Sequence, residues 1–173
     1  MKRFYTLILV VMFVVSINAQ ELGYTVGLSK LGYNPQQFQP LYGFTLGKLV
    51  QKNILLESSF FYSQRSYNND IQADYMSFML MPQFGLFKKS WGAYIGPSMA
   101  LNPTLHHSSI KNHTYVSAGL GAGVRFMIMK KVCLDGKVIY DKGLSGAYFD
   151  QGKYQNYDGI QIHLGMKFDL SCK

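Results

Sequence analysis

Hydrophobic and polar residues alternate along most of the chain, and the alternation is longest between Thr114 and Met129. Even-numbered positions of this stretch are mostly apolar, from Val116 to Ile128, whereas odd-numbered positions are mostly small or polar and include Arg125. Side chains on a strand point alternately to two faces, so the pattern predicts a strand with one apolar and one small or polar face. At ~3.3 Å per residue, such a strand is long enough to cross a bilayer at a tilt.

Seven further segments repeat this alternation, and no segment of the chain after the N-terminal apolar run shows a helical period. Long connections are expected after the first, third, fifth and seventh strands, and short turns after the others, which is typical of bacterial outer-membrane barrels. We therefore predict an all-β fold: an eight-stranded, antiparallel, up-and-down transmembrane β-barrel. Pro82 lies inside the fourth segment and predicts a bulge or a local break in the ladder. The predicted strands are 22–31, 41–50, 54–67, 75–87, 92–101, 114–129, 132–142 and 157–170.

The alternation alone leaves open which face of the barrel points outward. A soluble, lipocalin-like barrel has the same period, with its apolar face lining a ligand cavity. Two observations favour the membrane orientation. The polar face of the sixth strand is mostly glycine and serine, which suits a crowded lumen better than a solvated surface. The apolar faces carry bulky side chains on every strand, more than a small lumen can hold.

The N-terminus has the pattern of a cleavable secretory signal peptide. Lys2 and Arg3 precede a short apolar run, and Ala19 stands before a polar residue. We expect a signal peptide at 1–19 and a barrel domain at 20–173, with the mature protein in the cell outer membrane. A retained signal anchor is the alternative, but the apolar run is short for a spanning helix.

The charge of the chain is low in density and basic in balance. Charged residues make up 15% of the chain, against ~25% in a typical soluble domain. The formal net charge is +8, and it becomes +6 without Lys2 and Arg3. The excess is scattered along the sequence, so we expect no nucleic-acid partner. It suits contact with anionic lipid head groups. We expect no cofactor and no metal, and a monomeric barrel in contact with outer-membrane lipid.

Several charged or titratable residues fall on the inward faces of the predicted strands. Burying an unpaired charge in a narrow lumen costs several kcal/mol, so these side chains need partners. We interpret them as a structural network that plugs the barrel, and a proton or ion path is the alternative. The network is predicted to comprise Glu57, Arg65, Arg125, Asp135, Lys137, Asp141, His163 and Lys167.

Two further groups of residues are candidates for chemistry. Cys133 starts the seventh strand and Cys172 follows the eighth, so both are expected at the same periplasmic rim, where a disulfide is a candidate. The alternative is that each is a small apolar filler. One outer loop contains His106, His107 and His113 beside two serines. A rim hydrolase or a metal site is conceivable there, but no supporting acid is visible, and we expect polar loop decoration without a catalytic site.

Four sequence motifs resemble the Bacteroidetes outer-membrane β-barrel domain, the PorT-like group, and the likeness extends over the whole chain after the signal peptide. The resemblance implies an outer-membrane barrel; some members of the group are linked to protein export and most have no assigned activity. One departure is the tail after Phe168, since such barrels commonly end at a terminal aromatic residue. The motifs are Phe61-Tyr62-Ser63-Gln64-Arg65, Ala93-Tyr94-Ile95-Gly96-Pro97, Gly119-Leu120-Gly121-Ala122-Gly123-Val124-Arg125-Phe126 and Leu164-Gly165-Met166-Lys167-Phe168.

These observations together give a functional hypothesis with two alternatives. We expect a small, non-enzymatic outer-membrane barrel that is structural or accessory to envelope or protein transport. Its partners would then be envelope or secretion-machinery proteins. A lipid-modifying hydrolase with an active site at the rim is one alternative. A narrow porin-like channel is the other, which eight strands disfavour because their interior is just wide enough for side chains.

Overall fold

The computed structural model describes residues 19–31, 38–68, 71–106, 114–144, 147–148, 154–155 and 158–170. Apart from Ala19, the predicted signal peptide lies outside these residues. Within the described part of the chain, no helix has the length and apolar character needed to cross a membrane.

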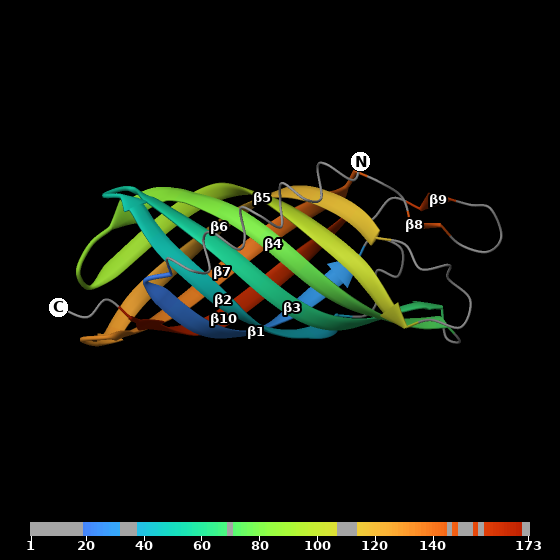
Figure 1. Ribbon diagram of the computed structural model, residues 1–173, viewed down its shortest axis with the longest axis horizontal. Coiled ribbons are helices and arrows are strands. Elements are labelled where there is room, and N and C mark those ends of the chain that lie inside the picture. Colours follow the sequence, from blue (N-terminus) through green and yellow to red (C-terminus); the bar gives the residue numbers. More distant parts are fainter. Residues whose placement is uncertain are drawn as a thin grey trace.

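Eight antiparallel strands form a closed barrel in the order β1-β10-β7-β6-β5-β4-β3-β2 (Figure 1). Each strand from β1 to β6 pairs with the next along the chain, and β10 returns to pair with both β7 and β1. The closing pair runs in register from Glu21 opposite Asp169 to Leu31 opposite Gly159. The predicted fold class is confirmed. The barrel strands are β1 (Glu21–Leu31), β2 (Gln39–Gln51), β3 (Ile54–Asn68), β4 (Ile71–Phe87), β5 (Trp91–His106), β6 (Thr114–Met129), β7 (Val132–Gly143) and β10 (Asp158–Asp169).

The apolar faces of the strands point outward, as the sequence predicted for the membrane orientation. Leu164 is 65% exposed, Tyr24 57% and Phe126 53%, and they lie on three different strands. Along β7, outward Leu134 and Val138 alternate with buried Asp135 and Lys137. Water would be a poor solvent for such an exterior, because monomeric soluble proteins rarely expose large contiguous apolar patches.

The connections differ from the prediction in two places. β4 begins at Ile71, so only residues 69–70 separate it from β3, and this connection is short where a long one was expected. The connection after β7 contains a two-stranded hairpin, β8 (Ala147–Tyr148) and β9 (Tyr154–Gln155), where the sequence indicated only a loop. At Pro82 the register with β5 does not shift, so there is no bulge, but residues 81–83 form no pairs with β5 between the Leu80–Met99 and Phe84–Ile95 pairs, which is the local break that the sequence predicted.

The lumen contains apolar as well as polar side chains. Met79, Met81 and Ile139 are almost completely buried and pack with Phe61 and Leu41 inside the barrel. From the sequence, the apolar side chains were expected on the exterior. An eight-stranded barrel encloses a space that side chains fill, so large apolar residues at inward positions complete the packing.

Candidate functional site

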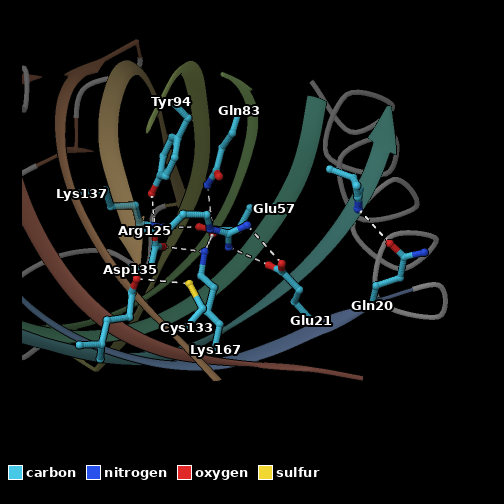
Figure 2. Close-up of polar contacts among 12 residues, drawn as sticks. Gln20, Glu21, Glu57, Gln83, Tyr94, Arg125, Cys133, Asp135, Lys137 and Lys167 are labelled. Atoms are coloured by element: carbon cyan, nitrogen blue, oxygen red, sulfur yellow. Dashed lines mark hydrogen bonds and ion pairs between the residues drawn. The ribbon is translucent and has the colours of Figure 1, made fainter. Parts of the chain in front are cut away.

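Four charged side chains from three strands meet inside the barrel. Glu57 of β3 lies between Lys137 of β7 and Lys167 of β10, with one carboxylate oxygen directed at each ammonium group (Figure 2). Lys167 Nζ also lies 2.6 Å from Asp135 Oδ2. All four residues are at most 4% exposed. We refer to Glu57, Asp135, Lys137 and Lys167 as the lumen network; its two lysines balance its two carboxylates.

Neutral side chains complete the bonding of the two carboxylates. Gln83 Nε2 donates to Glu57 Oε2 at 3.0 Å, and Ser59 Oγ donates to Glu57 Oε1 at 3.1 Å. Tyr94 donates its hydroxyl proton to Asp135 Oδ1 at 2.8 Å. Each oxygen of Glu57 therefore accepts two bonds. Side chains of β3, β4, β5, β7 and β10 are tied together across the barrel, the arrangement that makes a buried charge network tolerable.

Two inward glycines provide the room that the network needs. A Cβ at Gly23 would lie 2.7 Å from Lys167 Cγ, and one at Gly123 would lie 2.5 Å from the hydroxyl oxygen of Tyr94. Real Cβ atoms do not approach other atoms so closely. The space that a side chain would fill at these two glycines is thus occupied by long side chains of the neighbouring strands.

Arg125 forms a separate ion pair near the end of the barrel where the short turns lie. Its Nη1 and Nη2 donate to Glu21 Oε1 and Oε2 at 3.2 and 2.8 Å, and its guanidinium lies 5.6 Å from the ring centre of Phe87. The sequence predicts Arg125 in one network with Glu57. The structure instead gives it a partner from β1, the first residue of that strand.

The Arg125–Glu21 pair lies beside a small cavity at this end of the lumen. The cavity has a volume of about 160 Å³, and Cys133, Trp91 and Leu55 are among its lining residues. The Glu21 side chain keeps 23% of its exposure and the Arg125 side chain 10%, so water screens this pair more than it screens the lumen network.

We expect replacement of Arg125 by glutamine to lower the free energy of unfolding by about 1–3 kcal/mol, less than a break in the lumen network. The reason is that Glu21, left without its partner, can still be hydrated. Urea unfolding in detergent micelles measures the difference. Glu21→Gln is the matched control, because it breaks the same pair from the other side and should cost a similar amount. A larger loss for Arg125→Gln than for Glu57→Gln would contradict this assignment.

Asp141 and His163 belong to a second group of inward polar residues, joined by Gln161. Gln161 Nε2 donates to Asp141 Oδ2, and Ser98 Oγ donates to Asp141 Oδ1 at 3.2 Å. Gln161 Oε1 lies 2.9 Å from His163 Nε2. The imidazole also meets the ring of Phe61 edge-on, with ring centres 4.7 Å apart. Arg65 lies in β3, but its side chain lies outside the described part of the structure.

Three partners in these contacts were not assigned to the lumen from the sequence: Glu21, Gln83 and Tyr94. The signal for Glu21 was present, because it continues the inward face of Gly23 and Thr25 by one more step. Tyr94 likewise shares the parity of inward Gly92 and Gly96. Aromatic residues in a membrane strand are usually assigned to the lipid face, and parity was the better guide here.

The remaining candidates fall wholly or partly outside the described residues. Cys133 is buried, has no disulfide partner among the described residues, and its Sγ lies 3.3 Å from the carbonyl oxygen of Leu134. Its proposed partner Cys172 is not among the described residues, so the disulfide stays a prediction. Residues 107–113 and the side chain of His106 are also outside. In the part that is described, no group of three or more histidine, cysteine or acidic side chains is arranged to hold a metal ion.

No protein-family model matches the chain, and no curated protein matches it. Solved structures of small outer-membrane barrels do match its fold. Neisserial surface protein A has a TM-score of 0.68 at 13% identity, covering 86% of this chain and 96% of that one. OprG from Pseudomonas aeruginosa has a TM-score of 0.59 at 11% identity, covering 90% of this chain and 98% of that one. The outer-membrane enzyme PagL has a TM-score of 0.51 at 14% identity, covering 86% of this chain and 99% of that one. At these identities the likeness concerns the fold alone.

Proposed function

We propose that this protein is a sealed outer-membrane β-barrel without enzymatic activity, structural or accessory to transport in the cell envelope. The observation that carries the proposal is the lumen network: four buried, mutually paired charges of zero net charge lie across a barrel with an apolar exterior. A path for ions or solutes requires groups that can exchange partners with water. Here the carboxylate oxygens of Glu57 are already engaged twice each.

The apolar exterior and the likeness to outer-membrane barrels support the location. An exterior of leucine, phenylalanine, valine and isoleucine is stable in hydrocarbon, and closure of the sheet pairs the backbone groups that lipid cannot satisfy. The short turns β2–β3, β4–β5 and β6–β7 lie together at the left end of the barrel in Figure 1, where β10 also ends. By analogy with bacterial barrels, this end faces the periplasm, and the opposite end, where the longest connections lie, faces outward.

A role as an accessory to protein transport rests on the resemblance to the PorT-like group. A barrel with a plugged lumen cannot itself conduct a polypeptide, so such a role would be exerted through the loops, the turns or the lipid-facing surface. Its partners would be envelope or secretion-machinery proteins. No described contact favours the hydrolase alternative, since residues 107–113 lie outside the structure's described part.

Planar-bilayer recordings test the sealed lumen. We expect the refolded protein to show no steady conductance, because the lumen network would have to break before ions could pass. Insertion must be shown independently in the same lipid, by the folded protein's faster migration in unheated gel samples. Large, stable open channels from inserted protein would contradict the proposal and favour the porin-like alternative.

A further inference from the structure

The short turns of the barrel bring together lysines that are far apart in the sequence. Each of the three turns carries at least one lysine, and all of these are exposed. These lysines are scattered along the sequence, but the fold gathers them at one end of the barrel. An up-and-down barrel places every second connection at the same end, so turn residues about 40 positions apart become neighbours. We refer to six described lysines at this end, five in the turns and Lys48 near the end of β2, as the lysine rim: Lys48, Lys52, Lys88, Lys89, Lys130 and Lys131.

Acidic side chains do not balance the lysine rim among the described residues. Two carboxylates lie at this end: Glu21 is paired with Arg125, and Asp169 ends β10. At the opposite end, the described side-chain charges show no positive excess, because Lys30 and Lys142 stand against Asp74, Asp141 and Asp158. Lys142 and Asp158 also stand directly opposite each other in the register of β7 and β10. The described part of the barrel is therefore electrically polarised, with its positive charge at the short turns.

A cleft in the lysine rim combines positive charge with apolar surface. It lies between the β4–β5 turn and the end of β6 and has a volume of about 470 Å³. The cleft exists because β5 begins at Trp91 while β6 continues to Met129, beyond the point where the amide of Met127 bonds to the carbonyl of Ser90 at 2.9 Å. The lining residues are Lys89, Ser90, Met127, Ile128, Met129 and Lys130.

We propose that this cleft binds an anionic phospholipid of the periplasmic leaflet. Lys89 and Lys130 flank the cleft and contact the phosphodiester, whereas Ile128 and Met129, which are 48% and 67% exposed, contact the start of an acyl chain. The inference rests on the proposed membrane location with the short turns in the periplasm. Basic residues beside a membrane attract anionic head groups, and this attraction adds to apolar contact with the chains.

The surroundings of the cleft favour a lipid over an acidic protein. Trp91, the single tryptophan of the chain, lies at the same end with Lys88 Nζ 5.0 Å from its ring centre. Tryptophan is enriched at the level of the head groups, which places this end of the barrel at the membrane interface. A bare acidic peptide would use the lysines but leave Ile128 and Met129 facing water. A phospholipid matches both parts of the surface.

Native mass spectrometry of the refolded full-length protein tests the proposal, with phosphatidylglycerol and phosphatidylcholine of identical acyl chains as probes. We expect the wild type to retain phosphatidylglycerol preferentially. The double variant Lys89→Gln/Lys130→Gln should bind it about 30-fold more weakly. The matched control is Lys30→Gln/Lys142→Gln, which removes the same charge at the opposite end and should change binding by no more than about twofold, because charges beyond a Debye length are screened.

Three outcomes would overturn the inference while leaving the membrane proposal intact: equal retention of the two lipids, an equal loss in the control variant, or full competition by soluble glycerophosphoglycerol or an acidic peptide. The variant Ile128→Ser distinguishes lipid binding from binding of the charged head group alone. It should weaken binding of the lipid without changing competition by the soluble head group. Failure of the wild type to insert into bilayers of either lipid would overturn both proposals together.

Discussion

Replacing Glu57 by glutamine is expected to lower the free energy of unfolding of the barrel by about 3–5 kcal/mol, the range found when one partner of a buried charge pair is removed. The substitution keeps the shape of the side chain but leaves the lumen network with two ammonium groups and one carboxylate. Lys137 loses its carboxylate partner completely, and Lys167 keeps only Asp135. Urea unfolding in detergent micelles, followed by fluorescence of Trp91, measures the change.

A double-mutant cycle makes the Glu57 prediction specific. Lys137→Met alone leaves an excess negative charge, whereas Glu57→Gln with Lys137→Met restores neutrality around the Lys167–Asp135 pair. We expect the stability loss of the double variant to be smaller than the sum of the two single losses by about 2 kcal/mol or more. Lys142→Met, an exposed lysine on the same strand, is the control and should change stability by less than about 0.5 kcal/mol. Additive losses would show that the pair is not coupled.

Most of the barrel could be predicted because a strand in a membrane barrel reveals its two faces directly in the sequence. Eight alternating segments gave the strand number, the antiparallel order and the outward direction of residues such as Leu134 and Val138. Strand ends were less predictable. Residues 71–74 include polar Gln72 and Asp74, and residues 102–106 include Pro103, yet they extend β4 and β5 because the neighbouring strands continue alongside them and offer backbone partners.

The composition of the lumen network was predictable, but its pairing was not. Parity identifies which charges point inward, and it placed Glu57, Asp135, Lys137 and Lys167 in the lumen. Which of them meet depends on the tilt and stagger of the closed barrel, a property of the whole sheet. Thus Arg125 stands opposite Asp135 in the register of β6 and β7, yet its guanidinium bonds to Glu21 of β1.

Replacing Gly123 by valine is expected to destabilise the barrel by about 2–5 kcal/mol through overpacking and the loss of a buried hydrogen bond. A Cβ at this position would lie 2.5 Å from both Cζ and the hydroxyl oxygen of Tyr94, and 2.7 Å from the carbonyl oxygen of Gly136. The ring of Tyr94 must therefore move, and Asp135 Oδ1 loses the hydrogen bond that the Tyr94 hydroxyl group donates to it. Strand propensity alone would predict that Gly123→Val stabilises the barrel, because valine is favoured over glycine in strands.

The neighbouring variant Ala122→Val is the matched control for Gly123→Val. Ala122 lies on the same strand and is exposed on the outer face, so the added methyl groups meet no lumen side chain. We expect it to be neutral or slightly stabilising in urea unfolding. Tyr94→Leu should relieve the clash, so the double variant Gly123→Val/Tyr94→Leu should lose less stability than the two single variants added together. If Gly123→Val were as stable as Ala122→Val, the ring of Tyr94 would not lie against β6, and the hydrogen bond that positions Asp135 for Lys167 would have to be reassigned.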